Sequence, residues 1–538
     1  MKRVCVLLVC LFFPGIAAAN AGMVVAAQES AAEAGISMLK QGGNAFDAAA
    51  ATALALGVAE PGSSGIGGGG FFLLYIAREH RYVMLDARET SPALAGNGEV
   101  YETQSSIDGP QSAGVPGLAA GVDHLVSRYG KLTRGAVVQP AIELAKNGFE
   151  VSPRLQGMLN WRGKVFNDSA RNTFLAGTVI KQAALAETLT RFAKGGAGDF
   201  YRGETAGRLV ADMKRDGGLI READLAAYRV IEREPVLFDY QNYRVISASL
   251  PSSGGLTLAH VFGQLKDDDL KAMSQADRAH LLIEAMKRAY RDRNAHLGDS
   301  DFVDIPDLLG AQRLKALRAG IDMQRATPSA ALGNTPDAIG AGTDTTHFSV
   351  IDDEGNMVSA TLSINYGFGS GYVSPSTGIL LNDEMDDFAT RPGKPNAYGL
   401  VQGTANAVAP GKRMLSSMTP TFVIGPKRTF IVGTPGGSRI ISMVLLASLG
   451  FMLDESAPAD WVNAPRYHHQ FLPDEIQHEE GAFMPTVTIE LQKRGHTLKQ
   501  VSRQYGNMHA ILLDRETGNL TGLTDARGEG KVEALKAR

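Results

Sequence analysis

Thr345 is the residue in this sequence that is best placed to do chemistry. It lies in GTDTTHFSV (342–350), where a segment without helical or strand periodicity (327–344) meets a segment with the pattern of a β-strand. A threonine hydroxyl is a weak nucleophile unless a base lies beside it. If the peptide bond before Thr345 is cut, the new α-amine, with an ordinary pKa of about 7.7–8.0, can act as that base. The position therefore suggests a residue that carries both nucleophile and base once it becomes a chain terminus.

A structural explanation of the same pattern is also open, because a Thr-Thr pair at the start of a strand can simply reflect β-propensity. The segment 327–344 contains two Pro and three Gly, and loops of this length are uncommon in compact chains unless they are functional or mobile. Such a loop would let the Thr345 hydroxyl reach the Asp344 carbonyl and would leave the site after the cut. Motifs elsewhere in the chain decide between the two explanations.

Length and composition are those of a globular protein and argue against several kinds of site. The chain has 538 residues, of which 44% are apolar and 20% charged, enough for one large core or two to three ordinary ones. A formal net charge of −4 without a basic cluster gives no footprint for nucleic-acid binding. The glycine run GIGGGG (65–70) lacks the Lys-Ser/Thr of a phosphate loop. His468 and His469 have no partners at metal-ligand spacing, so we expect neither a metal nor an organic cofactor.

The first residues have the pattern of an export signal. A basic MKR is followed by the apolar VCVLLVCLFFPGIA and by small residues, AAANA. The apolar run is too short for a comfortable transmembrane helix. We therefore expect a signal peptide over residues 1–21, cut near Ala19 or Ala21, rather than a stable membrane anchor, and a periplasmic or secreted protein. Cys5 and Cys10 would leave with it, so the exported protein would form no disulfide.

Apolar periodicity and capping residues predict an alternation of helices and short strands. Helices are expected at 28–41, 44–56, 117–129, 134–147, 182–194, 204–216, 275–296, 438–450 and 485–494. Strands are expected in two hairpins, 71–77 with 81–87 and 346–352 with 356–364, and at 377–382, 420–424, 429–433, 508–514 and 519–524. Thr345 would therefore open the first strand of the second hairpin.

The order of nine short motifs resembles one known family. They are GGNAFDAA (42–49), GGGGF (67–71), LDARETSP (85–92), LPSSGG (250–255), TTHFSV (345–350), SINYGFGSG (363–371), GILLNDEMDDFA (378–389), KRMLSSMTPT (412–421) and TPGGSRII (434–441). Together they resemble the γ-glutamyltranspeptidase (glutathione hydrolase) family of N-terminal-nucleophile hydrolases, from Gly22 to about Arg527. The resemblance implies an α+β fold, a four-layer αββα sandwich built as one large domain. It also implies a cut at Asp344–Thr345 that yields a large subunit, 22–344, and a small subunit, 345–538, which stay together as a heterodimer.

The resemblance assigns catalytic roles to four residues. Thr345 would be the nucleophile, and Ser363 would lie beside its amine, where the family usually has threonine. Gly436 and Gly437 lie between a predicted strand and a predicted helix, where backbone N–H groups can face a developing oxyanion. Outside this context Ser363 would be an ordinary strand serine and the two glycines a structural turn.

The resemblance also implies how a glutamyl head group is held. Arg88 would form a bidentate pair with the α-carboxylate, and Ser416 and Ser417 would add hydroxyl donors. Three residues would surround the α-ammonium: Asn365, Glu384 and Asp387. Taken singly, Arg88 could be a surface ion pair with Asp86 or Glu89, and the acidic run a solvated turn.

The segment RPGKPNAYGLVQG (391–403) carries Tyr398, which the resemblance implies would close over the pocket toward Asn365 as part of a lid. A surface loop is the ordinary alternative.

We therefore predict an exported, self-processing γ-glutamyltransferase and glutathione hydrolase. It would pass the γ-glutamyl group of glutathione or a similar donor, through an ester on Thr345, to water or to the amine of an amino acid or dipeptide. Its partners would be these small molecules and not nucleic acid. Two alternatives stay open: an acylase of the cephalosporin or glutaryl type in the same fold, which need not bind an α-ammonium, and a processed but inactive periplasmic binding protein.

Overall fold

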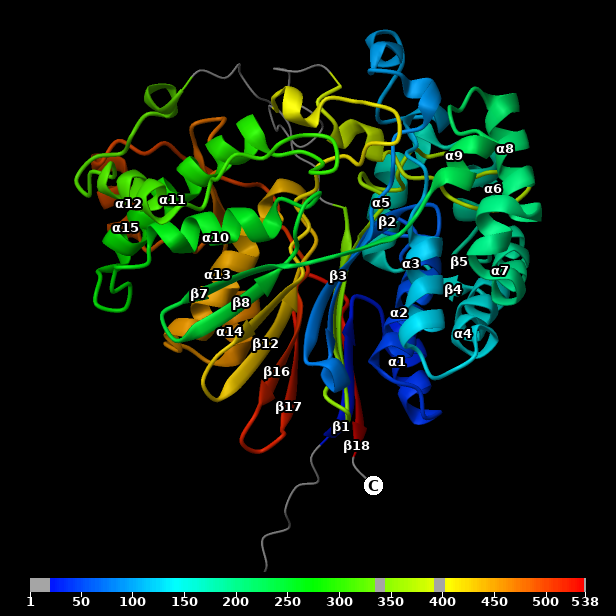
Figure 1. The fold of residues 1–538 in the computed structure, drawn as a ribbon, viewed down its shortest axis with the longest axis horizontal. Helices are drawn as coiled ribbons and strands as arrows, with labels where there is room; N and C mark the ends of the chain where they lie inside the picture. Colours follow the sequence, from blue (N-terminus) through cyan, green and yellow to red (C-terminus); the bar gives the residue numbers. More distant parts are fainter. Residues whose placement is uncertain (1–19, 334–343, 391–401, 537–538) are drawn as a thin grey trace, which may run out of the picture.

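Two β-sheets lie face to face between two layers of helices in the computed structural model of this protein (Figure 1). The structure describes residues 20–333, 344–390 and 402–536. The predicted α+β fold with four layers is therefore confirmed. Most of the expected signal peptide, and Tyr398 with most of its segment, lie outside the described residues.

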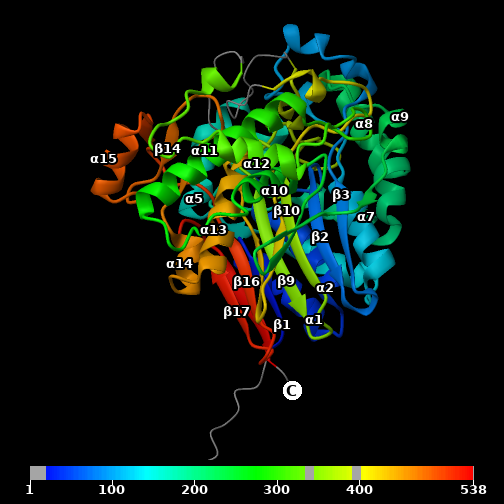
Figure 2. The ribbon, with the colours of Figure 1, turned by 60° about the vertical axis from the view of Figure 1, so that its left-hand side comes forward.

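The first sheet brings together strands from both sides of the Asp344–Thr345 bond. Its order is β18 (Lys531–Lys536), β1 (Asn20–Ala26), β9 (Thr346–Asp352), β10 (Met357–Ser363), β2 (Gly69–Ile76), β3 (Arg81–Ala87) and β6 (Ile231–Arg233). β9 pairs with β1, and β10 pairs with β2, both antiparallel. Figure 2 shows β9 and β10 lying between β1 and β2. A cut before Thr345 would therefore leave the two halves joined by continuous strand pairing.

The second sheet mixes the same two halves of the chain. Its order is β17 (Leu520–Thr524), β16 (His509–Asp514), β12 (Arg428–Gly433), β11 (Thr421–Ile424), β8 (Tyr243–Ser247) and β7 (Val236–Tyr240). Buried apolar side chains from both sheets, among them Val25, Leu73, Phe422 and Ile511, form the core between them. Two small sheets lie outside the sandwich: β13 (Tyr467–His468), β14 (Ile476–His478) and β15 (Leu498–Gln500), and β4 (Phe149–Glu150) with β5 (Val179–Ile180).

One helical layer covers the first sheet. It contains α1 (Glu29–Lys40), α2 (Ala45–Ala59), α3 (Leu118–His124), α4 (Arg134–Asn147), α7 (Ala183–Arg202) and α8 (Glu204–Asp216), with α5 (Pro153–Arg162), α6 (Asp168–Phe174) and α9 (Glu222–Ala227) nearby. α2 is buried almost all round, and its many alanines let β9, α1 and α4 approach it closely. The predicted cap of this helix is present, because the Asn44 side chain accepts from the N–H of Asp47 while Asp47 accepts from the N–H of Asn44.

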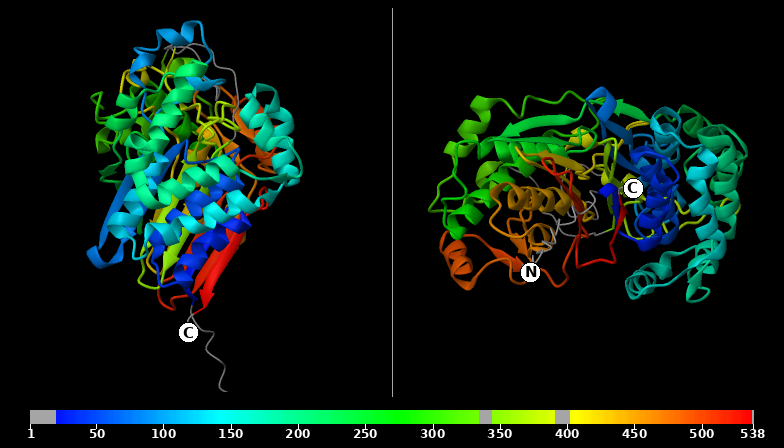
Figure 3. Two further views of the ribbon diagram at one scale, coloured as in Figure 1. Left: turned by 90° about the vertical axis from the view of Figure 1, so that its right-hand side faces the viewer. Right: turned by 90° about the horizontal axis from the view of Figure 1, so that it is seen from below.

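The other helical layer covers the second sheet, and Figure 3 shows the two layers on opposite sides of the strands when the molecule is seen from below. It contains α10 (Gly254–Gln264), α11 (Gln275–His296), α12 (Ala311–Ala319), α13 (Ile440–Leu453), α14 (Pro458–Asn463) and α15 (Pro485–Lys493). α11 begins as predicted, with the Ser274 side chain accepting from the N–H of Asp277 at 3.1 Å.

One predicted strand is wrong. Residues 377–382 form no strand beyond an isolated bridge between Val373 and Leu380. The apolar side chains there are divided between two cores, with Ile379 in one and Leu380 in another. Backbone groups are satisfied in loops instead of a ladder, as when Leu381 donates to the Tyr372 carbonyl.

Gly433 marks a close approach of the two sheets, because a Cβ there would lie 2.3 Å from Cε1 of His347 on β9. The His347 ring is fully buried and contacts the Thr361 hydroxyl at 2.9 Å, so it has little freedom to move. We expect Gly433→Ala to destabilise the protein by about 1–3 kcal/mol in urea unfolding. Gly207 on α8, with nothing within 4 Å of its Cβ position, is the matched control, and Gly207→Ala should not destabilise the protein. Equal stability of both variants with the parent would contradict the close approach.

Candidate active site

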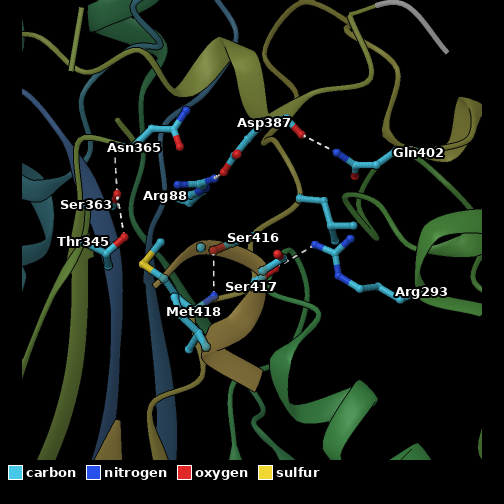
Figure 4. A pocket seen from close by; sticks show the side chains of 14 residues that line it. Arg88, Arg293, Thr345, Ser363, Asn365, Asp387, Gln402, Ser416, Ser417 and Met418 are labelled. Atoms are coloured by element: carbon cyan, nitrogen blue, oxygen red, sulfur yellow. Dashed lines mark hydrogen bonds and ion pairs between the residues drawn. The ribbon is translucent and has the colours of Figure 1, made fainter. Parts of the chain in front are cut away.

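Thr345 lies at the edge of the sandwich where β9 begins and β10 ends. It is 4% exposed, and its hydroxyl donates to the carbonyl oxygen of Asp344 at 2.8 Å. The pairing of Thr346 with Leu362 places Thr345 beside Ser363, and the two hydroxyl oxygens are 3.4 Å apart (Figure 4). The hydroxyl is therefore next to the carbonyl that it would have to attack.

A tight turn after β10 places Asn365 above Thr345 (Figure 4). The Ser363 hydroxyl accepts from the N–H of Asn365 at 2.7 Å, and Asn365 has a φ of +69°, which asparagine tolerates better than most residues. Its side-chain amide donates to the Asp383 carbonyl at 3.1 Å. Ser363 therefore positions the turn as well as the residue beside it.

Arg88 follows β3 and is the centre of a buried cluster of charges. Its guanidinium lies 2.6 Å from a carboxylate oxygen of Glu384 and 2.5 Å from one of Asp387, with Glu89 at 3.5 Å. Glu384 and Asp387 begin and end one short 3₁₀ helix, Glu384–Asp387, whose three-residue period puts both on one side. Arg88 is 1% exposed, so it is not a surface residue.

Three carboxylates share this single guanidinium, and the surplus of negative charge has a consequence for protonation. Burial, followed by the repulsion of Glu384, raises the pKa of Asp387 to about 7. Burial likewise raises the pKa of Glu384 to about 7 despite the nearby Arg88. The cluster is therefore able to accept an additional cation near neutral pH.

Ser416 and Ser417 are held from behind by the segment 250–255. The N–H of Ser416 donates to the Pro251 carbonyl at 2.8 Å, and the Ser416 carbonyl accepts from the N–H of Ser253 at 2.9 Å. The Ser417 hydroxyl accepts from the Arg293 guanidinium at 2.9 Å. Figure 4 shows both serines below Arg88.

The glycine turn before α13 has a backbone conformation that suits the predicted oxyanion-binding site. Gly436 and Gly437 have φ values of +140° and +60°, a region that side chains disfavour. A Cβ on Gly436 would also lie 2.5 Å from the Met443 methyl group. The turn ends in a 3₁₀ helix, Gly437–Arg439, which leads into α13. A helix N-terminus presents free N–H groups and positive dipole, which suits an oxyanion.

The structure brings most of the predicted residues around one cavity, lined among others by Arg88, Thr345, Ser363, Asn365, Asp387, Ser416, Ser417 and Gly437. Two of the predicted residues that the structure describes are not part of this lining. Glu384 is next to it through its contact with Arg88, and Gly436 directly precedes Gly437 in the chain. Tyr398 lies outside the described residues.

Sequence reasoning missed four polar or flexible residues of the lining: Arg293, Gln402, Met418 and Ser438. Gln402 donates to the Asp387 carbonyl at 3.0 Å. The sequence did carry a signal for Arg293 as a candidate site residue. It lies seven residues after Met286 and three after Tyr290, on the same face of α11. A charged residue at an apolar position of a buried helix indicates a partner or a site.

The comparison with known sequences decides the family. The family model described as gamma-glutamyltranspeptidase matches residues 31–535. This chain belongs to the γ-glutamyltranspeptidase family. The family and the class of enzyme predicted from the motifs are therefore confirmed.

Two relatives of this γ-glutamyltranspeptidase family member carry the name glutathione hydrolase proenzyme. The Escherichia coli (strain K12) protein is 38% identical over 96% of this chain and 92% of its own length. The Pseudomonas aeruginosa protein is 40% identical over 95% of this chain and 94% of its own length.

A solved structure of cephalosporin acylase from Bacillus halodurans is similar over 99% of this chain and 100% of its own, with a TM-score of 0.84 and 29% identity. The likeness supports the fold, and an acylase activity therefore stays open as the alternative.

In the part of the chain that the structure describes, no group of three potential metal ligands occurs. His468 contacts the Ser442 hydroxyl and His469 contacts Asp474, so the two rings have separate partners. None of the described helices combines the length and apolarity needed to cross a membrane.

Proposed function

We propose that this γ-glutamyltranspeptidase family member is an exported, self-processing hydrolase and transferase of γ-glutamyl compounds. Glutathione is the proposed donor, in keeping with the names of the relatives from Escherichia coli and Pseudomonas aeruginosa. The observation that carries the proposal is the cavity in which Thr345 meets Arg88 and Asp387, a cation and an anion suited to the two charges of a glutamyl head group.

Maturation is proposed to begin at the contact between the Thr345 hydroxyl and the Asp344 carbonyl. The hydroxyl oxygen attacks the carbonyl carbon, the C–N bond breaks, and the hydroxyl proton passes to the leaving nitrogen. Water then hydrolyses the resulting ester between Asp344 and Thr345. The products are a large subunit, 22–344, with a new carboxylate, and a small subunit, 345–538, with a free amine.

In the mature enzyme the free amine takes the proton from the Thr345 hydroxyl as the oxygen attacks the γ-carbonyl of the donor. The N–H groups at Gly436 and Gly437 stabilise the oxyanion. When the donor's amide bond breaks, its amine leaves with the proton, and a γ-glutamyl ester remains on Thr345. Water or an acceptor amine then attacks this ester and frees the hydroxyl.

The head group of the donor is proposed to bind between two sets of side chains. Arg88, Ser416 and Ser417 take the α-carboxylate. The α-ammonium lies among Asn365, Glu384 and Asp387, whose surplus negative charge favours a cation. An acylase whose substrate lacks the ammonium would have no use for buried acids at these positions.

A matched pair of anilides tests the proposed activity. The γ-glutamyl anilide carries the α-ammonium, whereas the glutaryl anilide lacks the ammonium but keeps a carboxylate at the same position. Release of aniline from the first and little from the second is the expected result. Equal or preferred release from the glutaryl compound would favour the acylase alternative, and no release from either, with binding retained, would favour the binding protein.

The acidity of the ammonium site predicts how the KM depends on pH. Burial holds the pKa of Glu384 and Asp387 near 7, against their ordinary acidic values. Both carboxyls contact the Arg88 guanidinium, and so does Glu89, at 3.5 Å. Below pH 7 the carboxyls carry protons that must leave when an ammonium binds, so binding is weaker there. We expect the KM of γ-glutamyl anilide to fall about tenfold or more between pH 5 and pH 7.5.

The glutaryl anilide is the control for this pH dependence, because it has no ammonium and its KM should not improve as the acids ionise. A KM for the γ-glutamyl donor that is flat from pH 5 to pH 7.5 would contradict the assignment of Glu384 and Asp387.

Export is proposed from the pattern of residues 1–21. N-terminal sequencing of the purified protein tests export and self-cleavage together, since it should find two termini, one near residues 20–22 and one at Thr345.

A further inference from the structure

Arg293 is a buried cation in the wall of the cavity that has no part in the mechanism described so far. It lies on the last turn of α11, is 1% exposed and lines the cavity together with Thr345 and Ser417. Its guanidinium donates to three neutral oxygens: the Ser253 hydroxyl at 2.9 Å, the Asn294 amide at 3.0 Å and the Ser417 hydroxyl at 2.9 Å.

The charge of Arg293 is not balanced by an ion pair within the described residues, in contrast to Arg88, which contacts two carboxylates directly. Asp387 lies near enough to influence Arg293, but its carboxylate is already engaged by Arg88. A guanidinium taken out of water without a counter-ion is costly unless something compensates it. A buried cation facing a ligand cavity therefore indicates an anionic group on the ligand.

Arg293 also fixes the direction of the Ser417 hydroxyl. A guanidinium can only donate hydrogen bonds, so the Ser417 oxygen accepts from Arg293 and its own hydrogen must point elsewhere. On the other side of Arg293, Ser253 donates to the Ser416 carbonyl at 2.7 Å while accepting from the guanidinium. Figure 4 shows Arg293 behind Ser417, on the side away from Thr345.

We propose that Arg293 is a positioning residue of the α-carboxylate site. It keeps the Ser417 hydroxyl oriented as a donor to the ligand, and it adds a positive charge at a site where the charge of Arg88 is already shared among three carboxylates. This inference rests on the proposed function and narrows it. The enzyme should select donors with a free α-carboxylate and discriminate against those in which that group is a neutral carboxamide. The segment LPSSGG (250–255), which the mechanism does not otherwise use, supports Arg293 and Ser416 through Ser253.

The test compares two donors that differ in one charge. One is the γ-glutamyl anilide, and the other is the same compound with its α-carboxylate converted to a carboxamide. In Arg293→Met, the KM of the carboxylate donor should rise about 10- to 100-fold, as expected for losing support of a charged hydrogen bond. The KM of the carboxamide donor should change less than about threefold. The kcat of Arg293→Met should also stay within about threefold of the parent protein's kcat for both donors. The preference for carboxylate over carboxamide should therefore collapse.

Arg288→Met is the matched control, because Arg288 lies on the same helix, is 2% exposed and pairs with Glu284 at 2.6 Å, away from the cavity lining. Damage to the helix alone would lower the activity on both donors alike and leave their ratio unchanged. Arg293→Lys keeps the charge but replaces the planar fork that donates to Ser253 and Ser417 with a single ammonium, so the preference for carboxylate over carboxamide should fall several-fold. If Arg293→Met does not mature, this Lys variant decides the question.

An unchanged ratio in Arg293→Met, or in Arg293→Lys if only that variant matures, would overturn the inference and leave Arg293 with a purely structural role. Failure of the proposed function looks different. In that case the parent protein itself, with Arg293 in place, would turn over neither donor.

Discussion

Thr345→Ala is expected to yield a single uncut chain that turns over no γ-glutamyl donor. The variant removes the oxygen that contacts the Asp344 carbonyl and so removes the proposed nucleophile of both maturation and turnover. Loss of a nucleophile commonly lowers kcat by on the order of 10⁴–10⁶-fold. Denaturing electrophoresis measures the cut, and release of aniline measures turnover.

The neighbouring threonine is a control that the fold itself provides. Thr346 points to the other side of β9, where its hydroxyl donates to Glu60 at 2.7 Å. Thr346→Ala should lose about 1–3 kcal/mol of stability, because it leaves a buried carboxylate oxygen without its donor, yet it should still be cut at position 345. Thr345→Ser keeps a hydroxyl and should be cut, more slowly. Two chains and full turnover in Thr345→Ala would refute the mechanism.

The elements that sequence reasoning predicted correctly are those with a local cause. The hairpins of β2 with β3 and β9 with β10 follow from apolar alternation around short turns, and α11 follows from Ser274 and its apolar face. β18 could not be predicted in this way, because Lys531–Lys536 pairs with β1 at the other end of the chain. Its residues are partly buried or exposed and carry no local mark of that partner.

The same distinction applies to the site. Thr345, Arg88 and the glycine turn could be predicted because their motifs are compact, whereas Arg293 reaches the cavity from the end of a long helix. Sequence patterns place Glu384 and Asp387 three residues apart, but only the fold shows that both contact Arg88, with Arg88 and Glu384 buried and Asp387 partly buried. The sharing of one guanidinium by these acids depends on contacts between residues about 300 positions apart, and the raised pKa of both acids depends on the burial that the fold gives them.

These contacts give Arg88 two proposed tasks, which a single and a double variant together can separate. Arg88→Met removes a proposed ligand of the donor α-carboxylate and also leaves Glu384 and Asp387 without their cation. We expect the KM of γ-glutamyl anilide to rise about 10²- to 10³-fold, the cost of truncating one partner of a buried charge pair. The carboxamide donor should lose less, because it never had the carboxylate that Arg88 binds. Cleavage at Thr345 should proceed, since Arg88 does not contact that residue's hydroxyl.

The stability of Arg88→Met should depend on pH, and the raised pKa values of Glu384 and Asp387 set the direction of that dependence. Without Arg88 their pKa values in the folded protein rise further above the ordinary values, so the folded state holds more protons than the unfolded state. Stability should therefore fall as the pH rises from about 4.5 through 8, with a loss of about 3–5 kcal/mol at the upper end. Arg88→Met with Asp387→Asn should recover much of this stability, because one buried charge is gone, without recovering the KM. An Arg88→Met protein with unchanged KM would show that the α-carboxylate binds elsewhere, and recovery of KM in the double variant would show that Arg88 serves only to neutralise the Asp387 carboxylate.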